Sequence, residues 1–482
     1  MKNSMKGLKT MKNTFSLILI ASMLMLASCE IPTDLNDNPN EITLQDVDAN
    51  LFLNGAQLAN IMVQNSHLNR ISGMFSGQLI GYTSLYSNIY GYSLSTVESN
   101  DEWNGCYTGV LTNVRHIVEA VPDDNLLVGI AKVVEAHAVG TLAILMGDVP
   151  YTEALNDAVD DPVFDSQLEV LADLTLLLDR AISDLGSASS RPESYDIYYD
   201  GDKDKWIAAA YTLKARYALI QSNYSAALAA ANMGISSSAG DMNFIPRGDA
   251  ATSEGDKNLF NAILSGSRTG DLGNNGSYLL ELLNDTTSAY RGNAKTNETA
   301  RHNYYKIDET SGEGNLGVIE RFEPMPMVTY SENQLIKAEA AARTGGDGLV
   351  HLNDYRAWLA GGGRLNAAFN DSAGILYDAY VSADFASGGM ENSDGVSTET
   401  ALLREIIEER YVSGFGTYMP FNDHRRLRGD SETDLIVPFP LNTTAASAHV
   451  ERIPYAQDEL TSNSNMTEDP GLYAKTKVNG GS

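Results

Sequence analysis

The sequence contains little cysteine and little positive charge. It has two Cys in 482 residues, and 33 Lys and Arg stand against 63 Asp and Glu, which gives a formal net charge of −30 at pH 7. Two cysteines are too few for a disulfide scaffold or a thiolate metal cluster. Because a chain this acidic repels phosphate backbones, we expect no nucleic-acid partner. The apolar fraction of 43% is ordinary and indicates a folded globular protein.

Motifs of common catalytic and metal sites are also missing. The sequence has no Walker loop, no His-Glu-x-x-His and no Gly-x-Ser-x-Gly, and its seven histidines never recur at metal-ligand spacing. A Gly-x-Gly-x-x-Gly at 312–317 has no strand pattern before it, which indicates a flexible loop. The 200–204 segment resembles a calcium loop but has Lys205 where that loop needs Gly, so we expect a helix cap. We therefore expect no cofactor, no metal and no catalysis.

A long apolar run is found at the N-terminus. It covers 15–26, follows four lysines and is too short to span a bilayer, so residues 1–28 are predicted to be a signal peptide. The run ends in Leu26, Ala27, Ser28 and Cys29, which resembles the lipobox of a bacterial lipoprotein. We therefore predict that Cys29 is acylated and becomes the N-terminus. The alternative is an ordinary secretory signal that happens to be followed by Cys.

The remaining chain is more acidic than the whole. Taking four lysines from 33 leaves 29 basic residues against 63 acidic ones, a charge of −34, so we expect lipid rather than charge to provide the anchor. We expect residues 29–43, which are polar, to be a leash and 44–482 to be a single helical domain. No further apolar run near 18 residues is expected, so the body is predicted to be soluble and tethered. Cys106 is expected to be a buried small hydrophobe.

Apolar residues recur with helical spacing after residue 44. In 203–221, for example, Trp206, Ala210, Leu213 and Tyr217 fall on one stripe. The pattern predicts helices near 45–65, 102–120, 125–146, 166–186, 203–221, 223–234, 328–344, 349–360 and 400–412. Tetratricopeptide-type pairs are expected for 102–120 with 125–146, 166–186 with 203–221 and 328–344 with 349–360. The predicted fold class is therefore mainly α, with helix pairs, long loops and minor β-strands.

Several side chains on these predicted helices are expected to be structural. Trp206 and Trp358 occupy helical positions that favour the core. Glu339 and Arg343 stand four residues apart, and the acids at 405, 408 and 409 share a short helix with Arg410. Ion pairing on the faces of single helices is the expected explanation for both sets.

Aromatic residues cluster in the segments predicted to be loops. Sugars and peptides are held on flat aromatic faces, while Asn and Asp bind their hydroxyls or amides. The candidate ligand-binding residues are Tyr82, Tyr86, Asn88, Tyr90, Tyr92, Asp101, Trp103 and Tyr304. The alternative is that single tyrosines pack loops against the helical body, but for the cluster as a whole we favour ligand binding.

Several short motifs follow one another in a fixed order along the chain. After the lipobox-like residues come Asp-Leu-Asn-Asp-Asn-Pro-Asn at 34–40, Gly-Asp-Val-Pro-Tyr-Thr-Glu-Ala at 147–154 and Tyr-Tyr-Asp-Gly-Asp at 198–202 leading into Trp206. Later come Glu-Ile-Ile-Glu-Glu-Arg-Tyr at 405–411 and Glu-Arg-Ile-Pro-Tyr at 451–455. The ordered set resembles the SusD/RagB family of Bacteroidota outer-membrane lipoproteins, in particular its subgroup with a Gly-Asp-x-x-x-Trp segment.

This resemblance implies a SusD-like fold built on four tetratricopeptide-like helix pairs. It also implies an outer-membrane lipoprotein, anchored through N-terminal acyl chains and facing the cell exterior, that captures oligosaccharides or peptides without cleaving them. The partner implied is a SusC-like TonB-dependent transporter, which the protein would cover as a lid. None of the matched motifs includes the candidate ligand residues, so their proposed role comes from composition and position alone.

Two other functions stay open at this point. A surface glycoside hydrolase would use an Asp/Glu pair, whose separation is a tertiary property that the sequence does not reveal. A scaffold protein would use the helix pairs only to organise partners in the outer membrane.

Overall fold

The structure is a computed structural model that describes residues 48–249, 251, 255–370 and 374–481. The predicted signal peptide, Cys29 and the leash at 29–43 lie outside the described residues. The described chain is mainly α-helical, as the sequence predicts.

Long helices form where the sequence has a helical period. Their bounds are α2 (Ala49–Asn65), α5 (Asn100–Asn104), α6 (Thr112–Ala120), α7 (Asn125–Met146), α8 (Gln167–Ser187), α9 (Lys203–Ile220), α10 (Tyr224–Ala231), α14 (Tyr330–Arg343), α15 (Gly348–Ala360) and α16 (Thr398–Ser413). A π-helical segment, Gly105–Leu111, joins α5 to α6, so the helix predicted at 102–120 is one continuous helical run with a local change of winding. The predicted helices are confirmed wherever their residues are described.

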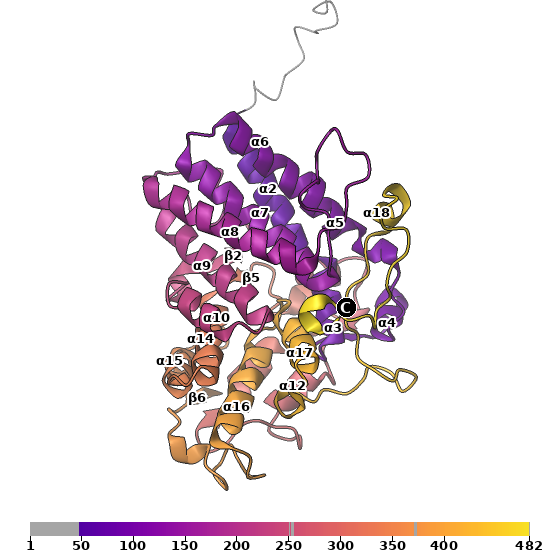
Figure 1. Ribbon diagram of the computed structural model, residues 1–482. Coiled ribbons are helices and arrows are strands. Elements are labelled where there is room, and N and C mark those ends of the chain that lie inside the picture. The colour runs from indigo at the N-terminus through magenta and orange to yellow at the C-terminus, as the bar shows by residue number, and fades with distance from the viewer. Residues whose placement is uncertain (1–47, 250, 252–254, 371–373, 482) are drawn as a thin grey trace, which may run out of the picture. The chain divides into compact units, whose positions relative to one another are not determined.

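The predicted pairs pack against each other. Helix α6 packs on α7, α8 packs on α9, and α14 packs on α15. In Figure 1 helices α2, α5, α6, α7 and α8 gather in the upper part of the view, and α14, α15 and α16 lie in the lower part. Helix α10 contacts both α9 and α14, so it links the two groups.

Helix α7 corrects one expectation. Its 22 residues are long and apolar enough to cross a membrane, although no such run was expected after the N-terminal one. Within the protein, however, 94% of its most apolar window is buried. Helix α7 is therefore the central core helix, in contact with α2, α6, α8 and α9.

Side-chain caps define where several helices begin. Asp202 accepts hydrogen bonds from the backbone N–H groups of Asp204 (3.1 Å) and Lys205 (3.3 Å) at the start of α9. The helix cap predicted in this segment is confirmed. Asp124 caps α7 and Thr329 caps α14 in the same way, which satisfies N–H groups that have no partner inside the helix.

Further short elements lie outside the helices predicted above. The additional helices are α3 (His67–Phe75), α4 (Ser84–Tyr90), α11 (Leu259–Leu264), α12 (Tyr278–Leu283), α13 (Thr299–Tyr305), α17 (Met419–Gly429) and α18 (Gln457–Ser462). Short 3₁₀ turns lie at Thr96–Ser99, Ser238–Gly240, Gly312–Gly314, Ser382–Asp384, Thr433–Leu435 and Lys477–Asn479. The expectation that the 81–92 segment is a loop is wrong, because α4 occupies most of it.

Three two-stranded antiparallel sheets join distant parts of the chain. Strand β1 (Ile80–Gly81) pairs with β3 (Leu272–Gly273), β2 (Met242–Phe244) with β5 (Met325–Val328), and β4 (Thr296–Asn297) with β6 (Leu376–Tyr377). The minor strands predicted for the loops are confirmed. Each pairing brings segments together that lie at least 79 residues apart in sequence.

Buried ion pairs connect the elements of the C-terminal half. Glu339 pairs with Arg343 on its own helix, as predicted, but also with Arg426 of α17. The acidic side chains of α16 are expected to pair within their own helix, but they bind an arginine of another segment. Arg291, which lies outside α16, donates to Glu405 (2.9 Å), Glu408 (2.7 Å) and Glu409 (2.8 Å). These carboxylates therefore bind between segments, because a charge buried this deeply needs a counter-charge.

Candidate functional site

Four of the predicted ligand-binding side chains are buried. Tyr86 is 2% exposed and accepts a hydrogen bond from Arg70 Nε (2.8 Å). Tyr92 is 9% exposed, and its hydroxyl oxygen accepts from the Asn442 N–H (3.0 Å). Trp103 packs among other aromatic rings, and Tyr304 is fully buried. For the three tyrosines the alternative interpretation, packing with a locally satisfied hydroxyl group, fits the structure, because the Tyr304 hydroxyl also has a partner in Glu323.

The other four predicted residues remain accessible. Tyr82 directly follows β1, Asn88 and Tyr90 lie on α4, and Asp101 lies on α5. Asn88 and Asp101 are exposed, whereas Tyr82 and Tyr90 are partly buried. The charge of Asp101 acts on His67. Tyr82, Asn88 and Tyr90 are the three accessible candidate residues of the 82–92 segment, so the prediction of a binding surface rests on them.

Tyr82 is held in place by the strand pair. Its backbone N–H donates to Asp271 O (2.8 Å), and its hydroxyl donates to the backbone oxygen of Asn275 (3.0 Å). The ring lies over Gly273 of β3, where an added Cβ would stand 3.0 Å from Tyr82 Cε2. Glycine at 273 therefore makes room for the ring, and the ring orientation is fixed before any ligand arrives.

Electrostatic neighbours show which groups share this surface. Burial, the Glu309 carboxylate and, to a smaller extent, the Tyr90 phenol raise the pKa of Tyr82 to about 12. Tyr82 therefore stays neutral at physiological pH, and its hydroxyl acts as a hydrogen-bond donor. We define the tyrosine surface as Tyr82, Asn88, Tyr90, Asn275 and Glu309. It combines partly exposed phenol rings with amide and carboxylate groups, a chemistry that suits a neutral polar ligand.

Asn275 and Glu309 were not predicted from the sequence. Both come from segments almost 200 residues or more after Tyr82, and only the β1–β3 pairing brings the first of them near. No local motif marks either residue. A polar residue after a predicted strand is too common a signal to select them.

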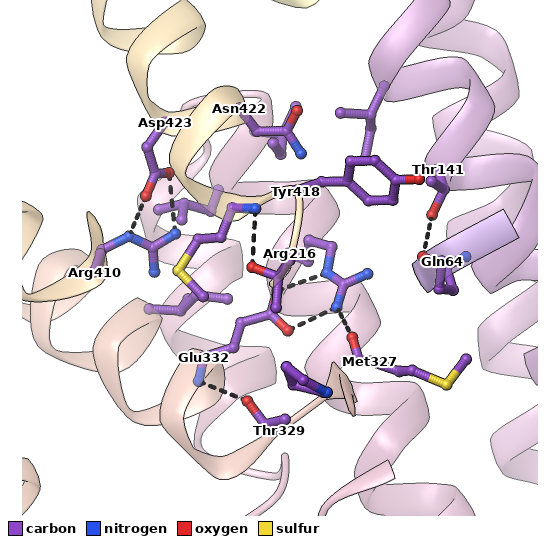
Figure 2. A pocket seen from close by; sticks show the side chains of 17 residues that line it. Gln64, Thr141, Arg216, Met327, Thr329, Glu332, Arg410, Tyr418, Asn422 and Asp423 are labelled. Atoms are coloured by element: carbon purple, nitrogen blue, oxygen red, sulfur yellow. Dashed lines mark hydrogen bonds and ion pairs between the residues drawn. The ribbon is translucent and has the colours of Figure 1, made fainter. Parts of the chain in front are cut away.

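An internal cavity of about 40 Å³ lies between helices α9, α14 and α17. Figure 2 shows Arg216 bonded to Glu332 and to the backbone oxygen of Met327, and Arg410 bonded to Asp423. A cavity of this size holds about one to three water molecules, so it is too small for a nutrient ligand. The cavity is part of the polar core that joins these helices.

An open pocket of about 230 Å³ adjoins this cavity. The two share Pro326, Thr329, Thr417 and Met419 as lining residues. Trp358 of α15 forms part of the open pocket and is only partly buried, so its assignment to the core is wrong. The other tryptophan, Trp206, is fully buried as predicted and donates to Asp196 Oδ2 (2.7 Å).

Metal and thiol chemistry find no site in the described part of the chain. No group of three or more His, Cys, Asp or Glu side chains there could hold a metal ion. Cys106 is fully buried, as predicted, and burial raises the pKa of its thiol far above the ordinary value. Its thiolate form, the nucleophile, is therefore not populated at neutral pH.

Comparisons with known proteins give one family and one fold. Residues 39–351 match the SusD-like family model described as starch-binding associating with outer membrane. None of the curated proteins compared with the chain matches it.

Solved structures share the fold at low sequence identity. A SusD/RagB family protein from Bacteroides thetaiotaomicron is 19% identical with a TM-score of 0.68, and the match covers 90% of this chain and 100% of that one. A chitin-binding SusD homologue from Flavobacterium johnsoniae is 17% identical with a TM-score of 0.65, covering 89% and 98%. A SusD homologue from Bacteroides uniformis is 15% identical with a TM-score of 0.64, covering 91% and 99%. Because the family model spans more than half of the sequence, the chain belongs to the SusD-like family of starch-binding proteins that associate with the outer membrane.

Proposed function

We propose that this protein captures oligosaccharide nutrients at the cell surface without cleaving them and delivers them to a SusC-like TonB-dependent transporter. The observation that carries the proposal is the tyrosine surface, where Tyr82 is oriented by Gly273 and Asn275 and lies beside Tyr90. Family membership supports a glycan as the ligand class. Peptides are the second ligand class to be tested, as the resemblance to the RagB branch implies.

Isothermal titration against maltooligosaccharides, chitooligosaccharides and short peptides tests the ligand class. We expect at least one glycan to bind. Tyr90→Ala should lower the affinity for this glycan about threefold to tenfold, because it removes one aromatic contact. Tyr82→Phe keeps the ring but loses the hydroxyl bonded to Asn275, so it should weaken binding less than Tyr82→Ala.

Tyr211→Ala is the matched control, because Tyr211 is also a partly buried tyrosine but lies on α9. Its affinity should equal that of the wild type. Equal affinity of all the tyrosine variants would remove the tyrosine surface from the proposal, even if a glycan binds.

The lipid anchor belongs to the same proposal. We expect Cys29 to carry the acyl chains, so that Cys29→Ala abolishes labelling with radioactive palmitate and releases the protein from the membrane fraction. Unchanged labelling of this variant would show that acylation occurs elsewhere. The anchor matters for function because a tethered binding protein stays next to its transporter.

Partnership with a transporter can be tested by co-purification from outer membranes. We expect a TonB-dependent transporter of the same organism to co-purify in about equal amount with the tagged protein. If the transporter co-purifies but no glycan or peptide binds, the scaffold function is favoured over nutrient capture.

A glycoside hydrolase is the alternative function. It needs two carboxyl groups about 5–10 Å apart on either side of the bound sugar. The open pocket contains two, Asp241 and Glu323, but both carboxylate oxygens of Glu323 already accept hydrogen bonds, from Tyr304 and Asn366. We therefore expect unchanged oligosaccharides after incubation with the protein, and released products would favour the hydrolase.

A further inference from the structure

The open pocket beside β5 shares no lining residue with the tyrosine surface. Its walls come from the start of β2, from the segment before β5, and from the C-terminal end of α15 with the residues that follow. The volume of about 230 Å³ equals that of about eight water molecules. This is room for a single amino acid or a single sugar unit, but not for a long oligosaccharide.

One wall of the pocket is a supported aromatic ring. Trp358 lines the pocket and is partly exposed. Its ring contacts Tyr330 (5.4 Å between centroids, edge-on) and Tyr355 (5.3 Å). Because both tyrosines are buried, the indole is held in position and offers a flat apolar surface to a ligand.

Two opposite charges line the same pocket without pairing with each other. Among the described residues, Asp241 forms no ion pair, and its carboxylate accepts one hydrogen bond, from the Tyr330 N–H (2.6 Å). Arg364 forms no ion pair in the described part of the chain either, and Nη1 donates to Phe415 O (2.9 Å). One carboxylate oxygen and several guanidinium N–H groups therefore remain available to a ligand.

The raised pKa of Asp241 agrees with the lack of an ion-pair partner among the described residues. Burial raises the pKa of its carboxyl group to about 7, whereas the Tyr330 N–H and the Arg364 charge act in the opposite direction. The other charged group that lines the pocket is Glu323, and the phenols of Tyr199 and Tyr330 also interact with Asp241. A ligand that brings a positive charge next to Asp241 would stabilise the carboxylate.

We propose that this pocket binds a small zwitterion with a flat apolar side chain, such as an aromatic α-amino acid. The ligand's ammonium group binds Asp241, its carboxylate binds Arg364, and its ring lies against Trp358. A neutral sugar of the same size would hydrogen-bond to both residues but would leave the Asp241 charge uncompensated. The proposed site is independent of glycan capture at the tyrosine surface.

Saturation-transfer NMR with L-phenylalanine tests the site, because a ligand of this size is expected to bind with a dissociation constant of about 1 mM. We expect 2-phenylethylamine, which lacks the carboxylate, and 3-phenylpropionate, which lacks the amine, to bind about tenfold or more weakly. Glucose should give no saturable signal. If glucose binds as well as L-phenylalanine, the proposed ligand class is wrong.

Variants then assign the contacts. Asp241→Asn keeps an oxygen for the Tyr330 N–H, so it should fold normally while its affinity for L-phenylalanine falls about 10- to 100-fold. Trp358→Ala should also lower the affinity for L-phenylalanine. The matched control is Asp157→Asn, at an exposed position, which should leave the affinity unchanged. Circular dichroism and the melting temperature show whether each variant is folded.

A pH series gives a readout that does not depend on loss of structure. Because the ammonium group binds the ionised form of Asp241, the affinity of the wild type should rise between about pH 6 and pH 7.5, and Asp241→Asn should abolish that rise. Absence of saturable L-phenylalanine binding, or Asp241→Asn with wild-type affinity and pH dependence, would overturn the proposal. Arg364→Lys, which keeps the charge, should retain part of the affinity and tests the carboxylate contact without neutralising the site.

Discussion

Replacement of Glu339 by Gln should destabilise the fold strongly. Glu339 is fully buried on α14 and receives hydrogen bonds from Arg343 (2.9 Å) and from both terminal nitrogens of Arg426 (2.9 and 2.7 Å). Arg410 Nε lies 3.5 Å from Oε2. Removal of the carboxylate leaves three buried guanidinium groups short of a counter-charge, and the pairing of α14 with α16 and α17 depends on these contacts.

The magnitude follows from the titration of the carboxyl group. Although burial opposes ionisation, the charges of Arg426, Arg410 and Arg343 together lower the pKa of Glu339 from 4.5 to about 2. Since each pKa unit corresponds to about 1.4 kcal/mol, the ionised Glu339 stabilises the folded state by about 3 kcal/mol at pH 7. The folded pKa lies below the unfolded one, so this contribution is complete above pH 4.5 and is lost as the pH falls toward 2.

Urea unfolding of wild type and Glu339→Gln at two pH values measures this contribution. We expect the unfolding free energy of the variant to be about 3 kcal/mol below that of the wild type at pH 7. This difference between the two proteins should be smaller by about 2 kcal/mol at pH 3. Glu313→Gln is the control, because its exposed ion pair with Lys257 should contribute less than about 1 kcal/mol. A difference in unfolding free energy between wild type and Glu339→Gln that is below about 1 kcal/mol at pH 7, or equal at both pH values, would refute the electrostatic explanation.

Three further predictions follow from packing, two for substitutions and one for the reactivity of a thiol. Gly140→Ala should destabilise the protein by about 1–3 kcal/mol in urea unfolding, because the new Cβ would clash with the buried Tyr217 hydroxyl. Gly186→Ala on α8 should instead raise the unfolding free energy by about 0.5 kcal/mol, since no atom lies within 4 Å of the added methyl group. Cys106 should react with a thiol reagent such as DTNB only after unfolding, and rapid reaction of the native protein would contradict its burial.

The long helices could be predicted because one face of each is buried over several turns. In α9, Trp206, Leu213 and Tyr217 repeat on one stripe, and all three are buried in the structure. Helix α4 follows the same rule, with Tyr86 and Ile89 buried three residues apart, but it is only seven residues long. Such a segment is shorter than the window in which helical periodicity can be recognised. The shortest of the missed helices therefore escape prediction because of their length and not because of their chemistry.

The candidate site could be predicted only in part. The aromatic composition of 82–92 selected Tyr82 and Tyr90 correctly as accessible rings, but it selected Tyr86 and Tyr92 equally, and these are buried. What separates them is the partner of each hydroxyl group. Arg70 holds Tyr86 from a neighbouring helix, and Asn275 holds Tyr82 from across a strand pair. Both contacts are tertiary, so composition carries no information about them.

The acidity of the chain bears on the choice of ligand. Several of its few basic residues are arginines taken up inside the fold, where Arg301, Arg356, Arg410 and Arg426 are each at most 3% exposed. These arginines bind buried carboxylates or backbone oxygens, and the described residues bury more Asp and Glu than Arg side chains, so the acidic excess that remains on the outer surface comes from the large surplus of acids in the sequence. Glu309 on the tyrosine surface adds to this excess locally. A neutral glycan avoids the resulting repulsion, whereas sulfated or uronate-rich glycans should bind weakly, and less weakly as salt is added.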